Sequence, residues 1–165
     1  RFWRRWAQIA GCALLVSAGS AVMFPRSWIS FGVLHGIAVM LVLARLAAPM
    51  RGGLWLLGAV ALVLPWLVKH PFFDTPFSNW VGLITRKPVT EDYVPVLPWL
   101  GVMWWGMAAG QWVLARGWMD RLNRATEGMP LRHLAWIGRW SLSWYMLHQP
   151  VLMGMLMAVG WVMGR

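Results

Sequence analysis

Five long apolar runs fill most of this chain and constrain its fold more than any other feature. They span roughly Ala7–Phe24, Trp28–Ala48, Gly53–Val68, Tyr93–Ala115 and Leu134–Gly164. An α-helix rises about 1.5 Å per residue, so most of these runs are long enough to cross a hydrocarbon core about 30 Å thick. The third run is the shortest and crosses only with help from its flanks or from a thinner bilayer. The sequence therefore predicts an all-α, polytopic transmembrane helix bundle with about five spanning helices.

The composition predicts a surface that largely faces lipid. Hydrophobic residues make up 59% of the 165 residues and charged residues only 12%, about half the charged share of a typical soluble domain. Many of the 15 tryptophans lie near the ends of the apolar runs, where indole rings anchor at the headgroup layer. The net charge of +10 does not indicate nucleic acid, because the basic residues lie in short gaps between apolar runs. We expect the lipid bilayer to be a partner and nucleic acid not to be one.

The distribution of basic residues predicts an orientation. With a cytoplasmic N-terminus and five alternating helices, ten basic residues lie at cytoplasmic ends and five lie outside, as the positive-inside rule requires. The C-terminus is then outside. The outer segment Lys69–Asp92 is rich in proline and aromatic residues, which favours a packed lid over a tether. We expect residues 1–165 to form a single transmembrane domain, and the start at Arg1 suggests the C-terminal portion of a longer protein.

His35 lies within the second run, where an ionisable side chain marks a functional site by default. It stands in FGVLHG, between Gly32 and Gly36, a small-xxx-small pair beside which another helix is expected to approach closely. Counted along a helix from Trp28, His35 lies roughly 10 Å inside the membrane. A catalytic or substrate-binding role is one interpretation. An interhelical hydrogen bond that only fixes packing is the other.

The fifth run carries a polar helix face. Ser141, Tyr145 and His148 recur at positions i, i+4 and i+7 of SLSWYMLHQP, with Gln149 at the edge of the stripe. Such a face must contact protein or a water-filled cavity. We expect His148 to lie near the middle of the membrane, where it and His35 approach each other. A purely structural polar zipper is the alternative.

The fourth run opens with EDYVPVLPWLG, which places candidate acceptor-binding residues at the outer rim. These are Asp92, Tyr93 and Trp99, and Pro95 and Pro98 are expected to distort the first helical turns. A carboxylate near an imidazole raises its basicity, as proton abstraction from a hydroxyl or amine requires. Alternatively, Asp92 only marks a solvated helix start that its own helix dipole favours.

Four arginines after the fourth run could hold an anionic donor such as a nucleotide or a phosphopantetheine carrier: Arg116, Arg121, Arg124 and Arg132. The alternative is that these charges set the topology and meet anionic lipid. The sequence contains no nucleotide-binding glycine loop, no zinc-ligand spacing and no serine-elbow motif, and we expect no metal.

Three stretches resemble a known family: FGVLHGIAVMLVLAR, NWVGLITRKPVTEDYVPVLPWLGVMWWGMAAG and RHLAWIGRWSLSWYMLHQPVL. They are similar to bacterial membrane proteins grouped with the catalytic domain of heparan-alpha-glucosaminide N-acetyltransferase, formerly a domain of unknown function. The similarity covers essentially the whole chain. The last stretch is also similar to the terminal helix of membrane acyltransferases that modify surface sugars.

The resemblance implies a bundle in the bacterial inner membrane that moves acetyl groups from cytosolic acetyl-coenzyme A to an outer acceptor, a sugar amine or hydroxyl. It also implies about two further helices upstream, including a histidine that is the family's best candidate for carrying the acetyl group or acting as general base. In this interpretation His148 and His35 handle the acyl group or its proton, and Gln149 and Tyr145 stabilise an oxyanion or hold the imidazole. The arginines contact coenzyme A phosphates.

Two other classes stay open. A non-enzymatic transporter or scaffold would use the same buried polar groups for passage or packing. A haem protein could ligate iron between His35 and His148, because imidazoles from two helices suit bis-histidine iron. Assembly into a homo-oligomer is also left open by the sequence.

Overall fold

The structure is a computed structural model that describes residues 1–165 except 24, 91, 119–133, 135 and 165. Within these described residues the chain forms helices and loops and contains no strand, so the predicted all-α class is confirmed. The chain divides into two compact units, Arg1–Gly117 and Trp118–Arg165, which are described separately.

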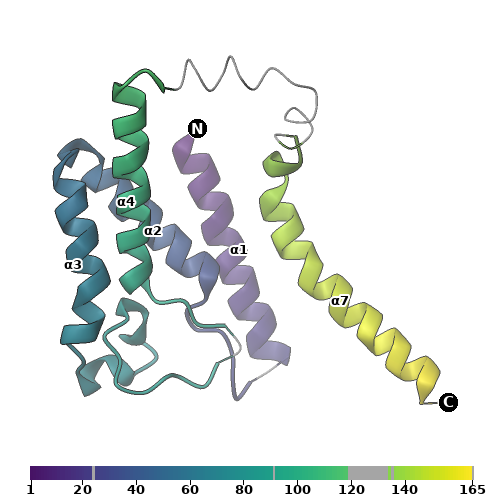
Figure 1. The fold of residues 1–165 in the computed structure, drawn as a ribbon. Helices are drawn as coiled ribbons and strands as arrows, with labels where there is room; N and C mark the ends of the chain where they lie inside the picture. Colours follow the sequence, from purple (N-terminus) through teal and green to yellow (C-terminus); the bar gives the residue numbers. More distant parts are fainter. Residues whose placement is uncertain (24, 91, 119–133, 135, 165) are drawn as a thin grey trace. The chain divides into compact units, whose positions relative to one another are not determined.

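The first unit contains four α-helices, shown in Figure 1: α1 (Phe2–Met23), α2 (Val33–Ala47), α3 (Gly53–Leu67) and α4 (Val96–Ala115). Helix α4 packs along α3, and α2 contacts both α1 and α4. Three short 3₁₀ helices join them: η1 (Ala48–Met50), η2 (Pro71–Asp74) and η3 (Asn79–Val81). Two segments of the described chain, Phe2–Met23 and Val33–Met50, are long and apolar enough to cross a membrane. The count of five spanning helices stays a prediction.

In the second unit the structure describes helix α7 (Ser141–Met163). A short helical segment at residues 136–139 precedes it and ends in a turn at Trp140. The fifth apolar run is therefore not one continuous helix from residue 134, as the sequence analysis expected. Apolar character alone does not reveal such a break, because the apolar run continues through it.

Glycines allow α3 and α4 to pack closely. A side chain on Gly58 would overlap the indole ring of Trp105 and lie 3.1 Å from the carbonyl oxygen of Gly101. Trp105 Nε1 donates a hydrogen bond of 2.9 Å to the carbonyl oxygen of Trp55, which links the two helices again. Leu54 next to this contact is fully buried. Close backbone approach, rather than large interlocking side chains, therefore sets the distance between these helices.

Two helices begin later than their apolar runs predict. Helix α2 begins at Val33 instead of Trp28, because residues 28–32 form an irregular segment. His35 therefore lies in the first turn of the helix, so a helical count from Trp28 to His35 is wrong, and the depth of His35 in the membrane stays a prediction. Helix α4 has Pro95 at its N-cap and extended backbone at Leu97, so the expected distortion of its first turns is confirmed.

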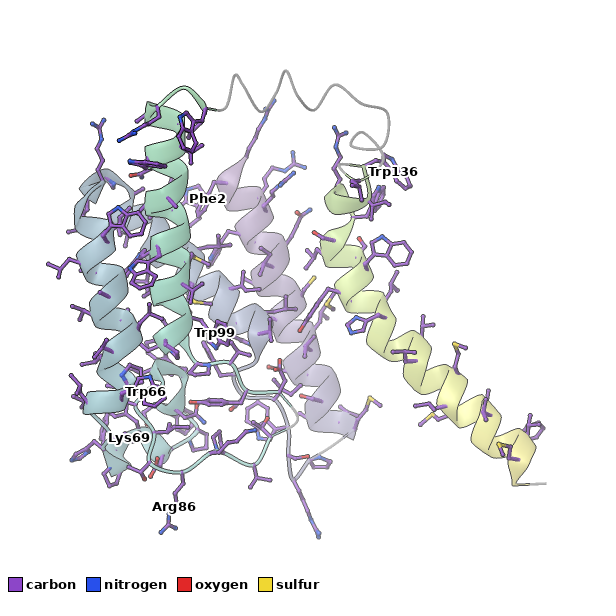
Figure 2. The ribbon with its side chains drawn as sticks, viewed as in Figure 1. Phe2, Trp66, Lys69, Arg86, Trp99 and Trp136 are labelled. Atoms are coloured by element: carbon purple, nitrogen blue, oxygen red, sulfur yellow. The ribbon has the colours of Figure 1, made fainter. Side chains whose placement is uncertain are left out.

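Large apolar side chains cover much of the described surface. Leu14, Leu56 and Leu156 expose 67%, 71% and 71% of their area, and many tryptophans are similarly open. Lipid accepts such a surface, whereas water does not accept contiguous apolar patches of this extent. Figure 2 shows Lys69 and Arg86 at the same end of the first unit as Trp66. An apolar belt with basic residues and indoles at a helix end is typical of membrane proteins.

Candidate functional site

Hydrogen bonds hold both nitrogens of the His35 ring within the first unit. Nδ1 accepts a hydrogen bond of 3.4 Å from the backbone nitrogen of Gly32, and Nε2 lies 3.3 Å from Oγ of Ser17 on α1. The Ser17 hydroxyl itself donates a hydrogen bond of 2.7 Å to the carbonyl oxygen of Ile29. The neutral ring that fits this pattern carries its proton on Nε2 and donates it to Ser17. His35 therefore joins α1, α2 and the segment between them.

Asp92 caps helix α2 instead of its own helix. Its Oδ2 accepts a hydrogen bond of 2.8 Å from the backbone nitrogen of Val33, the first residue of α2. A carboxylate at this position also meets the positive end of the helix dipole. The alternative interpretation, that Asp92 interacts with the dipole of its own helix, is therefore wrong, because Asp92 caps α2. Asp92 and His35 do lie together at one helix end, as the acid–imidazole interpretation expected.

The small-xxx-small pair beside His35 is occupied by an extended segment, not by the helix that the sequence analysis expected. A Cβ atom on Gly32 would overlap Oδ2 of Asp92, and one on Gly36 would lie 3.0 Å from the carbonyl oxygen of Val94. The two glycines thus make room for residues 92–94 just before α4. The predicted close approach at Gly32 and Gly36 is confirmed, but the predicted helical partner is wrong. The spacing of two glycines does not show which segment packs against them.

Tyr93 joins the same segment to the outer loop. Its hydroxyl donates a hydrogen bond of 2.7 Å to the carbonyl oxygen of Asn79, a buried residue with only 3% of its surface exposed. Burial, helped by the negative charge of Asp74, raises the pKa of Tyr93 to about 12. The phenol is thus neutral at physiological pH and acts as a hydrogen-bond donor.

The outer segment is ordered by its own hydrogen bonds, which agrees with the packed lid expected from its sequence. Oδ1 of Asp74 accepts a bond of 2.7 Å from the backbone nitrogen of Thr85, and the Thr85 hydroxyl bonds to Oδ2. These hydrogen bonds hold the pKa of Asp74 below its ordinary value, and the bond from the Thr85 hydroxyl has the largest effect. At Gly82, with φ of +101°, a side chain would overlap the carbonyl oxygen of Leu97, so only glycine fits where the loop meets α4.

His148 on α7 has the opposite ring arrangement to His35. Its Nδ1 lies 2.6 Å from the carbonyl oxygen of Tyr145, and a carbonyl only accepts, so Nδ1 carries the proton. In the neutral ring the lone pair is therefore on Nε2. The Tyr145 and His148 rings lie 5.6 Å apart, so the two residues share a helix face, as their spacing predicted. His148 and His35 belong to different units, so their expected approach to each other stays a prediction.

The structure shows fewer contacts for the remaining candidate residues, and some of them lie outside its described part. Trp99 lies on α4 (labelled in Figure 2) and is 52% exposed. Gln149 lies within α7, but its side chain is outside the described part of the structure. Arg116 ends α4, with its guanidinium carbon 4.6 Å from the centre of the Trp112 ring. The remaining three donor-binding candidates lie outside the described residues: Arg121, Arg124 and Arg132.

Comparison with known families decides the relationship. The family model described as heparan-alpha-glucosaminide N-acetyltransferase, catalytic, matches residues 1–150. The chain belongs to this family. No curated protein and no solved structure matches it. The heparan-alpha-glucosaminide N-acetyltransferase family and the two long apolar helices together indicate a membrane-associated protein with acetyltransferase ancestry.

Two residues of this site, Ser17 and Asn79, were not predicted from the sequence. Ser17 and Ser20 form an i, i+3 pair in the apolar second half of α1, and Ser20 accepts a bond of 3.0 Å from the backbone nitrogen of Ile29. That spacing was a usable signal. Asn79 had no such signal, since only the fold shows that its backbone meets Tyr93.

The haem alternative fits this geometry poorly. Iron ligation needs a ring nitrogen with a free lone pair, and in His35 that lone pair on Nδ1 accepts from Gly32. Ligation through Nε2 would instead require loss of the proton shared with Ser17. Either route breaks the cap at the start of α2.

Proposed function

We propose that this protein is a membrane acetyltransferase that moves an acetyl group from cytosolic acetyl-coenzyme A to a sugar amine or hydroxyl at the outer side of a bacterial inner membrane. The family match over residues 1–150 carries this proposal. The orientation with a cytoplasmic N-terminus and an external C-terminus belongs to the same proposal and is supported by the excess of basic residues at the cytoplasmic ends.

His148 is the proposed general base. Its bond to the Tyr145 carbonyl keeps the proton on Nδ1 and presents the Nε2 lone pair, the form that a base needs. As the acceptor nitrogen or oxygen bonds to the acetyl carbonyl carbon, Nε2 takes its proton. The carbon–sulfur bond then breaks, and the coenzyme A thiolate leaves and recovers a proton. Gln149 and Tyr145 are proposed to stabilise the oxyanion formed in between.

His35 and Asp92 are proposed to position the outer end of the site. Together they hold the start of α2, through the Val33 and Gly32 nitrogens and through Ser17. The proposed acceptor enters beside Asp92, Tyr93 and Trp99. A rigid helix end matters here, because displacement of a reacting group by about 1 Å costs on the order of 100-fold in rate.

The test is acetyl-coenzyme A consumption by the purified protein in lipid nanodiscs with an amino sugar as acceptor. We expect His148→Ala to lose at least about 100-fold in kcat, the lower range for general base catalysis. His70→Ala is the matched control, because His70 lies in the outer segment and its ring only accepts a bond from the Phe72 nitrogen. Full turnover by His148→Ala would remove the base assignment, and no turnover with any amine or hydroxyl would favour a transporter or scaffold.

A second pair of variants tests the role of His35. Glutamine at the third position of a helix also bonds back to the N-cap nitrogen, so His35→Gln should keep the cap and most of the activity, whereas His35→Ala should lose both. Loss of kcat in His35→Gln with an unchanged unfolding free energy would instead show that the imidazole itself handles a proton or the acyl group.

A further inference from the structure

The segment between α3 and α4 carries an exposed surface that the candidate site does not use. Phe72 and Phe77 expose 67% and 93% of their area, and Lys69 and Lys87 are exposed as well. These four side chains are called the aromatic–basic surface below. Figure 2 shows Lys69 at this end of the first unit, together with Arg86, which extends away from the helices.

Hydrogen bonds fix the turn that carries the two phenyl rings. The Ser78 hydroxyl donates a bond of 2.6 Å to the carbonyl oxygen of Phe72, and the Trp80 indole donates one of 3.0 Å to that of Phe77. Asn79 in the same turn is buried and accepts the bond from Tyr93. The turn is therefore anchored in the first unit while its phenyl rings stay exposed, so their exposure is built into the fold.

The carboxylates that the structure describes in this segment are bound elsewhere. Asp74 accepts bonds from Thr85 and from the backbone nitrogen of Arg86, which places residues 85–87 beside η2. Asp92 caps α2. Among the described residues, neither Lys69 nor Lys87 forms an ion pair with them. The two ammonium groups are therefore open to an anion outside the protein.

The aromatic–basic surface continues from the end of α3, where Trp66 and Leu67 expose 83% and 76% of their area. Aromatic rings and lysines together are typical of segments at the headgroup layer, because the rings enter the acyl region while the ammonium groups stay among phosphates. Anionic lipid complements the unpaired positive charge of this surface, whereas zwitterionic lipid does not.

We infer that the aromatic–basic surface docks onto the adjacent leaflet, where Lys69 and Lys87 pair with anionic phospholipid headgroups and Phe72 and Phe77 insert beneath them. The outer segment is then held at the membrane surface and does not stand in water. This inference rests on the exposed side chains and their charge, and not on the proposed acetyl transfer.

The experiment measures whether residue 77 lies in lipid. Phe77→Cys in a Cys12→Ser background leaves one thiol for the environment-sensitive fluorophore NBD, because Cys12 is the only native cysteine. The full chain is placed in nanodiscs of phosphatidylcholine, with and without phosphatidylglycerol, at one copy per disc. Quenching by lipids with a doxyl group near the headgroup reports the docked fraction. We expect phosphatidylglycerol to raise this fraction.

Removing the two lysines should weaken docking where the lipid is anionic. Attraction to an anionic leaflet is worth about fivefold in the docking constant for each lysine, so Lys69→Gln/Lys87→Gln should lower it about 25-fold with phosphatidylglycerol. The variant should change little in phosphatidylcholine alone. Arg4→Gln/Arg5→Gln is the matched control, because it removes the same charge from exposed side chains in the first turn of α1. It should leave docking unchanged.

The contribution of the rings is tested separately. Phe72→Ser should lower docking about tenfold in both lipids, because an inserted phenyl ring is lost. The ring is largely exposed and the bond from Ser78 goes to the backbone of residue 72, so the unfolding free energy should stay close to that of the parent.

Three results would overturn the inference. The first is the absence of quenching in every lipid, which would place the segment in water. The second is docking that is the same with and without phosphatidylglycerol, or that is unchanged in Lys69→Gln/Lys87→Gln. The third is shielding of the fluorophore only in discs that hold two copies, which would show that a second copy covers the surface. None of these readouts uses acetyl-coenzyme A, so they are independent of the acetyltransferase proposal.

Discussion

Replacing Gly32 with alanine tests the link between Asp92 and helix α2. The backbone of Gly32 has φ of −111° and ψ of −169°, an extended conformation that any residue adopts, so conformation does not require glycine there. Space does, because the added methyl group would overlap Asp92 Oδ2 and lie 3.0 Å from its Cγ. We expect Gly32→Ala to push the carboxylate away from the Val33 nitrogen and to uncap the helix.

The magnitude follows from the lost cap. Removing a carboxylate cap costs about 0.5–2 kcal/mol of stability, and the charge at the helix end places Asp92→Ala in the upper part of that range. Gly32→Ala should cost a similar amount in the wild-type background. Once Asp92 is alanine, the main overlap is gone and the remaining one is with Cγ2 of Ile29 at 2.8 Å. Alanine also restricts the unfolded chain, a gain of roughly 0.4–1 kcal/mol.

The assay is a double-mutant cycle on unfolding free energies, measured by denaturant titration of the protein in mixed micelles. We expect the cost of Gly32→Ala to be smaller in the Asp92→Ala background, where only the overlap with Ile29 Cγ2 remains. The coupling should be about 1 kcal/mol or more, which exceeds the 0.3–0.5 kcal/mol scatter seen for independent sites. Additive costs would refute the reasoning, because the glycine would then matter for some reason other than the carboxylate.

Three further predictions concern the first unit. Gly58→Leu should cost about 1–3 kcal/mol in the same titration, because its side chain meets an indole ring of α4, whereas Gly106→Ala, which meets nothing within 4 Å, should be nearly neutral. Hydrogen bonds from Thr85 lower the pKa of Asp74, so they stabilise the outer segment fully at pH values above 3.8, the ordinary pKa of this group. This stabilisation is lost as the pH falls through the lower pKa of Asp74 in the folded protein. Cleavage of the outer segment by pepsin should therefore accelerate only in that lower pH range, and equal rates at pH 4 and pH 2 would contradict this. The raised pKa of Tyr93, about 12, means that its stabilisation is complete below pH 10 and is lost as pH rises toward 12; absorbance at 295 nm, compared with Tyr93→Phe, should show a midpoint near 12 and not near 10.

Much of the fold was predictable because long apolar runs in the sequence predict helices. The third run and the helix observed there, Gly53–Leu67, agree almost residue for residue. The ends were less predictable, since residues 28–32 belong to the same apolar run as the helix that follows them. What separates them is the cap at Gly32 and its contact with Asp92, which lies 60 positions further along the sequence. A pattern read within one window cannot contain that contact.

The candidate site shows the same division. The polar spacing on α7 correctly predicted that Tyr145 and His148 share a face, because helical periodicity is a local property. The bonding of His35 was not predictable, because its partners come from α1 and from the preceding loop.

The two histidines differ in a way that the membrane environment explains. A capping box normally uses glutamate or glutamine at the third helical position, and here the position is His35. A neutral imidazole makes the same bond to the Gly32 nitrogen without placing another charge near the hydrocarbon region, where charge is costly. That use consumes the lone pair on Nδ1 of His35. The bond from His148 to a carbonyl consumes its proton instead and presents a lone pair. The bonding of the two rings therefore supports the proposed assignment of proton abstraction to His148, whereas His35 holds the start of α2.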